Sequence, residues 1–75
     1  MIRFKLKQLV AEYEFKKGER LTLGKVATAT GIHRTTLSKI SNTRGYNTTT
    51  DNLNALCKFF ECQLSDLAEF VDIEK

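Results

Sequence analysis

Residues 34–39 of this 75-residue chain hold hydrogen-bond donors and positive charges close together. Arg34 and Lys39 carry the charges, and Thr35 and Ser38 add hydroxyl groups. Guanidinium, ammonium and hydroxyl groups donate hydrogen bonds to oxygen and nitrogen acceptors, and the two cations attract anions. This chemistry suits the binding of an acidic or polar partner, because it lacks the acid–base pair or activated nucleophile that catalysis uses.

The rest of the chain also argues against an enzyme. It has one histidine, His33, no nucleophile motif, no glycine-rich phosphate loop, and no Asp or Glu between Arg20 and Thr50. Its two cysteines, Cys57 and Cys62, lack the paired spacing of metal ligands. We therefore expect a buried thiol at Cys57 and a second thiol near a helix end, with no metal, no cofactor and no catalytic activity.

Charge is distributed unevenly along the chain. The formal net charge is +3, but residues 1–50 hold ten Lys and Arg against three Asp and Glu, whereas residues 51–75 hold two against six. The acid-free segment between residues 20 and 50 contains five cations: Arg20, Lys25, Arg34, Lys39 and Arg44. A long segment without acids suits a surface that contacts a polyanion.

Length and hydropathy indicate one small folded domain that spans residues 1–75. Hydrophobic residues make up 41% of the chain and charged residues 28%, as in ordinary globular proteins. No apolar run approaches the roughly 20 residues that cross a bilayer. The opening MIRFKLKQLV mixes charged and apolar residues, so it lacks the apolar stretch of a secretory signal. We therefore expect a cytoplasmic protein.

Hydrophobic spacing predicts an all-α domain whose first three helices cover about residues 6–17, 23–30 and 34–41. Gly18 can end the first helix in the left-handed conformation. Thr22 can cap the second helix, because its side-chain oxygen can accept a hydrogen bond from the first turn.

Two further helices are predicted in the second half of the chain. Thr49 or Thr50 can cap a fourth helix, and Ser65 can cap a short fifth one. Phe59 and Phe60 are adjacent, so we expect that they cannot both face one core and that one of them is exposed. The apolar sides of the two helices consist of Leu53, Leu56, Cys57, Phe60, Leu67, Phe70 and Val71.

Gly31 separates the second and third helices at the spacing of a helix-turn-helix. It is expected to adopt a positive φ, which costs other residues about 1 kcal/mol or more. Leu37 and Ile40 repeat at helical spacing and are expected to face the core. The opposite side of this helix then consists of Thr35, Ser38, Lys39 and Asn42, with Arg34 at its amino end. Such a side suits the major groove of DNA, which admits a helix.

The segment LTLGKVATATGIHRTTLSKISNTRG resembles the phage-repressor and Cro-type helix-turn-helix regulators, also called the XRE family. TTTDNLNALCKFFECQLSDL is similar to the family's fourth and fifth helices, so the resemblance spans about residues 4–71. It implies a compact five-helix, lambda-repressor-like DNA-binding domain with the helix-turn-helix at about 22–42. It also implies base contacts from Arg34, Thr35, Ser38 and Lys39, and phosphate contacts from Thr22, Lys25, His33, Asn42 and Arg44.

Two positions depart from the family pattern. Leu23 stands where the family often has a glutamine that grips phosphate, which removes a polar contact there. Lys25 stands where a glutamate is frequent, and its positive charge is compatible with DNA. For His33, a surface or capping role remains as open as a phosphate contact.

The resemblance implies a sequence-specific regulator of transcription that binds double-stranded DNA. We expect a repressor that acts by occupancy, as a homodimer on a pseudo-palindromic operator. The dimer surface stays open between the last helix, with Phe70 and Val71, and a strand suggested by the alternation of Ile2 and Phe4. The alternative function is a protein-interaction module, such as the antitoxin of a toxin–antitoxin pair.

Overall fold

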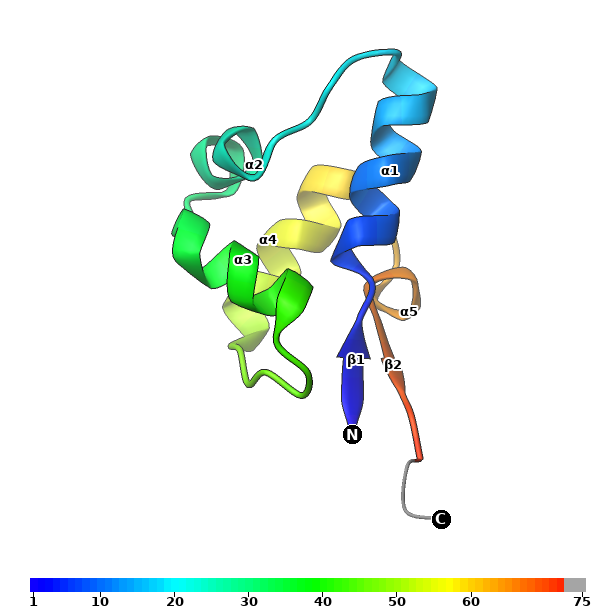
Figure 1. Ribbon diagram of the computed structural model, residues 1–75, viewed down its shortest axis with the longest axis vertical. Coiled ribbons are helices and arrows are strands. Elements are labelled where there is room, and N and C mark those ends of the chain that lie inside the picture. The colour runs from blue at the N-terminus through cyan, green and yellow to red at the C-terminus, as the bar shows by residue number, and fades with distance from the viewer. Residues whose placement is uncertain (73–75) are drawn as a thin grey trace.

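The computed structural model describes residues 1–72 and shows five helices joined to a two-stranded sheet (Figure 1). Helix accounts for 61% of this part of the chain, which confirms the all-α fold class. In chain order the elements are β1 (Ile2–Phe4), α1 (Leu6–Lys17), α2 (Leu23–Thr30), α3 (Arg34–Asn42), α4 (Thr50–Phe60), α5 (Leu64–Leu67) and β2 (Ala68–Phe70).

The first three helices begin and end close to their predicted residues, because their local signals act as expected. The N–H of Gly18 donates to the carbonyl oxygen of Glu14 at 2.9 Å, which closes α1. At the start of α2, Oγ1 of Thr22 accepts a hydrogen bond from the backbone N–H of Lys25 at 3.2 Å. α3 runs one residue further than predicted, to Asn42.

Helix α4 is capped by Thr49 rather than Thr50. Oγ1 of Thr49 accepts from the backbone N–H of Asn52 at 3.1 Å. The other end carries no glycine: Glu61 adopts a φ of +52°, and the next N–H, that of Cys62, donates back into the last turn of α4. The left-handed conformation of Glu61 therefore ends α4 at a residue that ordinarily avoids it.

The prediction for the last helix is wrong in both its cap and its end. Gln63 rather than Ser65 precedes the first turn, and its N–H donates to Oδ2 of Asp66 at 3.0 Å. The helix ends at Leu67, whose carbonyl accepts from the N–H of Lys5 at 2.6 Å, and the chain continues as β2. Periodicity could not reveal this ending, because β1 lies more than sixty residues away in the sequence.

The two strands form an antiparallel pair, so the short strand suggested by the alternation near the beginning of the chain is present. The register pairs Ile2 with Phe70, Arg3 with Glu69 and Phe4 with Ala68. The side chains of Arg3 and Glu69 also form an ion pair. The two segments that were separate candidates for a dimer surface therefore lie side by side in one sheet (Figure 1).

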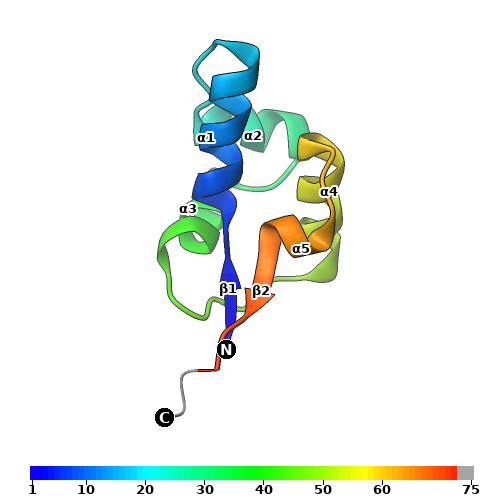
Figure 2. The ribbon, with the colours of Figure 1, turned by 90° about the vertical axis from the view of Figure 1, so that its right-hand side faces the viewer.

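The core consists of apolar side chains from the sheet-proximal end of α1, from α2 to α5, and from the loops between them. In Figure 2, α1 and α3 lie on one side of the molecule, and α4 and α5 lie on the other. Within residues 1–72 no polar or charged side chain is buried. The buried apolar residues are Leu6, Leu9, Leu21, Val26, Ile32, Leu37, Ile40, Leu56 and Leu67.

An aromatic cluster corrects the prediction that either Phe59 or Phe60 would be exposed. Both rings are half-buried, and they meet edge to face with centroids 4.9 Å apart. Tyr13 of α1 stacks on Phe59 at 5.6 Å, so it extends the core to include both rings. The thiol predicted to be buried, Cys57, is instead half-buried, as is Cys62.

Candidate DNA interface

The turn between α2 and α3 is held by both Gly31 and Thr30. Gly31 has a positive φ, as predicted, of +78°, and its N–H donates to the carbonyl of Ala27 at 2.9 Å. The hydroxyl of Thr30 donates to the carbonyl of Val26 at 2.7 Å and accepts from the N–H of Ile32 at 3.2 Å. Thr30 therefore braces the turn from both sides.

The inward side of α3 fixes which residues face outward. Leu37 is fully buried and Ile40 is 2% exposed, which confirms the predicted core contacts. Three of the predicted base-contacting residues, Arg34, Thr35 and Lys39, are exposed, whereas Ser38 is half-buried. α3 lies at the edge of the molecule in Figure 1, and its outer side is not covered by another helix.

Ser38 also differs from the other three in its hydrogen bonding. Its Oγ accepts a hydrogen bond from Nδ2 of Asn42, one turn further along α3, at 3.4 Å. Asn42 is exposed, so this bond joins a predicted base-contacting residue to a predicted phosphate-contacting one. The pair presents a polar end to α3 on the same side as Thr35 and Lys39.

The remaining predicted phosphate-contacting residues are exposed around α2 and both ends of α3. Nζ of Lys25 donates to the carbonyl of Arg20 at 3.1 Å, which holds its ammonium group beside the start of α2. His33 precedes α3 and makes no side-chain capping bond, so its imidazole does not act as the cap. The residues in this exposed group are Thr22, Lys25, His33 and Arg44.

Leu23, the departure at the start of α2, is half-buried and packs against the core. A side chain in this position gives up a polar contact and adds apolar contact between α2 and the rest of the domain. The apolar side chain of Leu23 therefore cannot make the hydrogen bond to phosphate that the resemblance implies for a glutamine at this position.

Electrostatically, α2, α3 and the adjoining turns form a positive surface. Residues 20–50 contain no Asp or Glu, and the ion pair seen within residues 1–72 joins β1 to β2 rather than involving this region. The cations of the helix-turn-helix are therefore not neutralised by acidic side chains in the described part of the chain. Phosphate groups supply the complementary charge in DNA.

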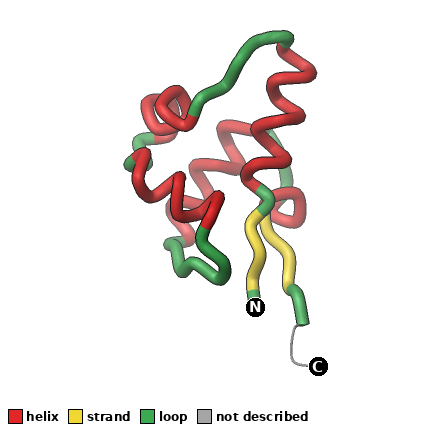
Figure 3. The backbone as a smooth tube through the Cα atoms, viewed as in Figure 1, coloured by secondary structure: helices red, strands yellow, loops and turns green. Residues whose placement is uncertain are grey.

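Sequence reasoning missed two residues that shape this region. No role was predicted for the side chain of Thr30, although a threonine just before a helix-ending glycine can bond both sides of a turn. Thr48 accepts a hydrogen bond from Nδ2 of Asn52 at 3.0 Å, which ties the α3–α4 loop to α4. Figure 3 shows this loop beside β1.

The two helices, their left-handed glycine turn and the exposed polar side of α3 define a helix-turn-helix domain. A family model for Cro/C1-type HTH DNA-binding domains matches residues 5–72, and the chain belongs to this family. Comparison with curated proteins and with solved structures gave no match.

Membership of this family makes the chain a sequence-specific DNA-binding domain with the role of a transcription regulator. Its partner is double-stranded DNA. Among the helices of residues 1–72, none is both long enough and apolar enough to cross a membrane.

Proposed function

We propose that this protein is a repressor that binds a pseudo-palindromic operator as a homodimer, with α3 in the major groove. The observation that carries the proposal is the outer side of α3, where Arg34, Thr35 and Lys39 are exposed opposite the buried Leu37 and Ile40. A helix that fills a major groove excludes other proteins from the same base pairs, so occupancy of a promoter is sufficient for repression.

In this proposal Arg34 and Lys39 donate to acceptors on guanine, and Thr35 offers a hydroxyl and a methyl group to neighbouring bases. Ser38, which is half-buried, contributes through its bond with Asn42. The phosphate backbone is held on either side of the groove by Thr22, Lys25, His33, Asn42 and Arg44.

Selection of bound fragments from a random DNA pool tests the proposal directly. A two-fold symmetric consensus is expected, with half-sites about 34 Å apart along the helix axis. Absence of any enriched sequence would contradict sequence-specific reading by α3. An enriched sequence without symmetry would contradict the homodimer.

Single substitutions then assign the contacts. Arg34→Ala should cost about 1–3 kcal/mol of operator binding and relax the preference at one base position. Arg44→Ala should weaken all DNA alike and reduce the slope of log affinity against log salt by about one unit. Lys58→Ala is the matched control, because it removes one positive charge from the exposed side of α4, outside the helix-turn-helix. If it lowers binding as much as Arg34→Ala, net charge and not α3 determines affinity.

For the dimer, we propose that a second copy docks on the exposed apolar residues of the sheet and α5. Ile2 is 46% exposed and lies directly opposite Phe70, which is 71% exposed. Leu64, 56% exposed, lines the same surface hollow as Ile2. Burial of a phenylalanine contributes about 1.5–3 kcal/mol, so Phe70→Ser should weaken dimerisation more than tenfold in sedimentation measurements.

Phe15→Ser is the matched control for the dimer. Phe15 is 89% exposed on α1 and lies outside the sheet. The Phe15→Ser substitution should leave the affinity of the dimer unchanged. A stronger effect of Phe15→Ser than of Phe70→Ser would move the interface to α1.

The same apolar residues favour one alternative, in which they bind a different protein, as an antitoxin binds its toxin. Co-expression with the neighbouring reading frame, followed by purification, distinguishes the two. A stoichiometric complex that is lost in Phe70→Ser supports the alternative, whereas a symmetric dimer of the isolated chain supports the repressor.

A further inference from the structure

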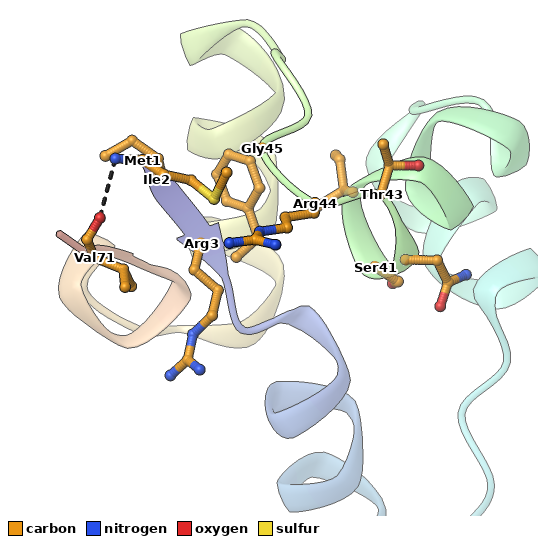
Figure 4. A pocket seen from close by; sticks show the side chains of 11 residues that line it. Met1, Ile2, Arg3, Ser41, Thr43, Arg44, Gly45 and Val71 are labelled. Carbon is orange, nitrogen blue, oxygen red and sulfur yellow. Dashed lines mark hydrogen bonds between the residues drawn. The ribbon is translucent and has the colours of Figure 1, made fainter. Parts of the chain in front are cut away.

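A cavity of about 330 Å³ lies between β1 and the end of α3 with the turn that follows it (Figure 4). It is lined by β1, by the inward-facing Ile40 and the residues that follow it up to Gly45, and by Val71, which directly follows β2. Figure 4 shows the side chain of Arg44 extending from the turn toward β1. Two residues of the proposed phosphate contacts, Asn42 and Arg44, therefore also border this cavity.

The walls of the cavity are mainly apolar. Ile40 is 2% exposed, and Phe4 is half-buried against the core. Ile2 and Val71 complete the apolar lining from the sheet side. Walls of this kind favour a hydrocarbon or aromatic group over water, and the volume lies at the lower end of the range for small-molecule sites.

The charged side chains that residues 1–72 contribute to the lining are all positive. Arg3 and Arg44 contribute guanidinium groups, and no Asp or Glu of this part of the chain lines the cavity. Arg3 is already paired with Glu69. Arg44 has no hydrogen bond or ion pair with any of residues 1–72. A guanidinium that has no partner among residues 1–72 and lies beside an apolar wall is complementary to a planar anion with an apolar tail.

We propose that this cavity binds a small organic carboxylate, with its apolar part between β1 and Ile40 and its carboxylate on Arg44. The binding needs no change in the core, since the cavity is already open beside the turn. Arg44 provides the two parallel N–H donors that match a carboxylate.

The proposal has a regulatory consequence, and this part rests on the proposed function. A carboxylate on Arg44 neutralises a cation that the operator phosphate uses, so carboxylate and DNA compete for the same side chain. By linkage, each lowers the affinity of the protein for the other by the same factor. The ligand would therefore act as an inducer that releases the repressor.

A titration without DNA tests the cavity by itself. Octanoate is the probe, octanol supplies the same tail without charge, and acetate supplies the carboxylate without a tail. Backbone NMR signals of Ile2, Phe4, Ile40 and Arg44, and the methyl signals of the two isoleucines, should shift with octanoate. Because ion pairs at exposed sites are weak, octanoate should bind only a few-fold, up to about fivefold, more tightly than octanol.

Arg44→Gln should remove the preference for octanoate over octanol and leave the spectrum of the core intact, because Arg44 is exposed. Lys58→Gln, which removes a charge from α4, should keep the preference. Equal shifts with octanoate and acetate, or shifts confined to residues outside the cavity, would overturn the proposal. So would an unchanged octanoate preference in Arg44→Gln.

A second titration uses the selected operator fragment. Octanoate should lower operator affinity of the wild-type protein beyond the effect of acetate at the same concentration, which controls for ionic strength. The affinity of Arg44→Gln should not respond to octanoate. If no operator is found, the proposed function fails while the titration without DNA still decides the cavity. If octanoate binds but operator affinity stays unchanged, competition through Arg44 is refuted.

Discussion

Substitution of Gly31 isolates the backbone cost of the turn between the two helices. Gly31 has a φ of +78°, and a Cβ built on it would meet nothing within 4 Å. Gly31→Ala therefore introduces no clash, and its whole effect comes from placing an L-residue in the left-handed region. That placement costs about 1–2 kcal/mol.

Gly24 provides the opposite case within the same helix-turn-helix. It lies in the first turn of α2 with ordinary helical backbone, and an added Cβ would be 3.7 Å from Oγ1 of Thr22, an ordinary contact. Gly24→Ala should stabilise the protein by about 0.5–1 kcal/mol, because alanine restricts the unfolded chain and favours helix. The two variants should therefore differ by about 1.5–3 kcal/mol.

Urea unfolding followed by circular dichroism at 222 nm measures both free energies. A change of one kcal/mol shifts the melting temperature of a domain of this size by about 4–8 °C. The melting temperatures of Gly31→Ala and Gly24→Ala should therefore differ by about 6 °C or more. Gly31→Asn should lower the free energy of unfolding less than Gly31→Ala does, because asparagine tolerates the left-handed region better than alanine. A Gly31→Ala variant as stable as the wild type, or more stable, refutes the left-handed turn on which the placement of α3 depends.

Three further predictions concern the core, a cap and a thiol. Leu56→Ala should cost about 2–5 kcal/mol in urea unfolding because Leu56 is fully buried; a loss below 1 kcal/mol would contradict that burial. Thr49→Ala should cost about 1 kcal/mol through its bond to the first turn of α4, whereas Thr50→Ala should cost less. The pKa of Cys62 is raised from 9.0 to about 11, mainly by burial and then by the neighbouring Cys57 and Asp66. At pH 8, iodoacetamide should therefore alkylate Cys62 about tenfold more slowly in the folded protein than in the chain unfolded in urea, and equal alkylation rates would contradict the raised pKa. The free energy of unfolding should fall as the pH rises from about 9 to 11.

The helix-turn-helix was predictable because its signals are local. Thr22 and Gly31 mark helix ends within one or two turns of the residues they bond, and the spacing of Leu37 and Ile40 alone sets the inward side of α3. The exposed side follows from those two residues with no knowledge of the partner helices. The family resemblance then agreed with the family model along nearly the same residues.

The C-terminal end was not predictable in the same way. The apolar spacing of Leu67, Phe70 and Val71, at i, i+3 and i+4, favours one side of a helix. The strand is set instead by pairing with backbone groups of β1, which belong to residues more than sixty positions earlier. The half-buried Phe59 and Phe60 escaped prediction for a related reason, because Tyr13 of α1 extends the core toward them.

The cavity was also hidden from the sequence. Ile2, Ile40 and Arg44 belong to three separate segments, and no spacing rule relates them. Only the closure of β1 onto β2 brings the first of these segments beside the end of α3.

The sheet joins residues that are 64 to 68 positions apart, from Phe4–Ala68 to Ile2–Phe70, whereas the helices form through short-range bonds. Closing so long a loop costs conformational entropy, and the three residue pairs of the register offset that cost only in part. The strands should therefore be the last part of the domain to assemble and the first to open, with amide hydrogens at Arg3 and Glu69 exchanging before those of α3. Transient opening of the sheet changes the apolar residues that a second copy would contact, without unfolding α3, the helix proposed to enter the major groove.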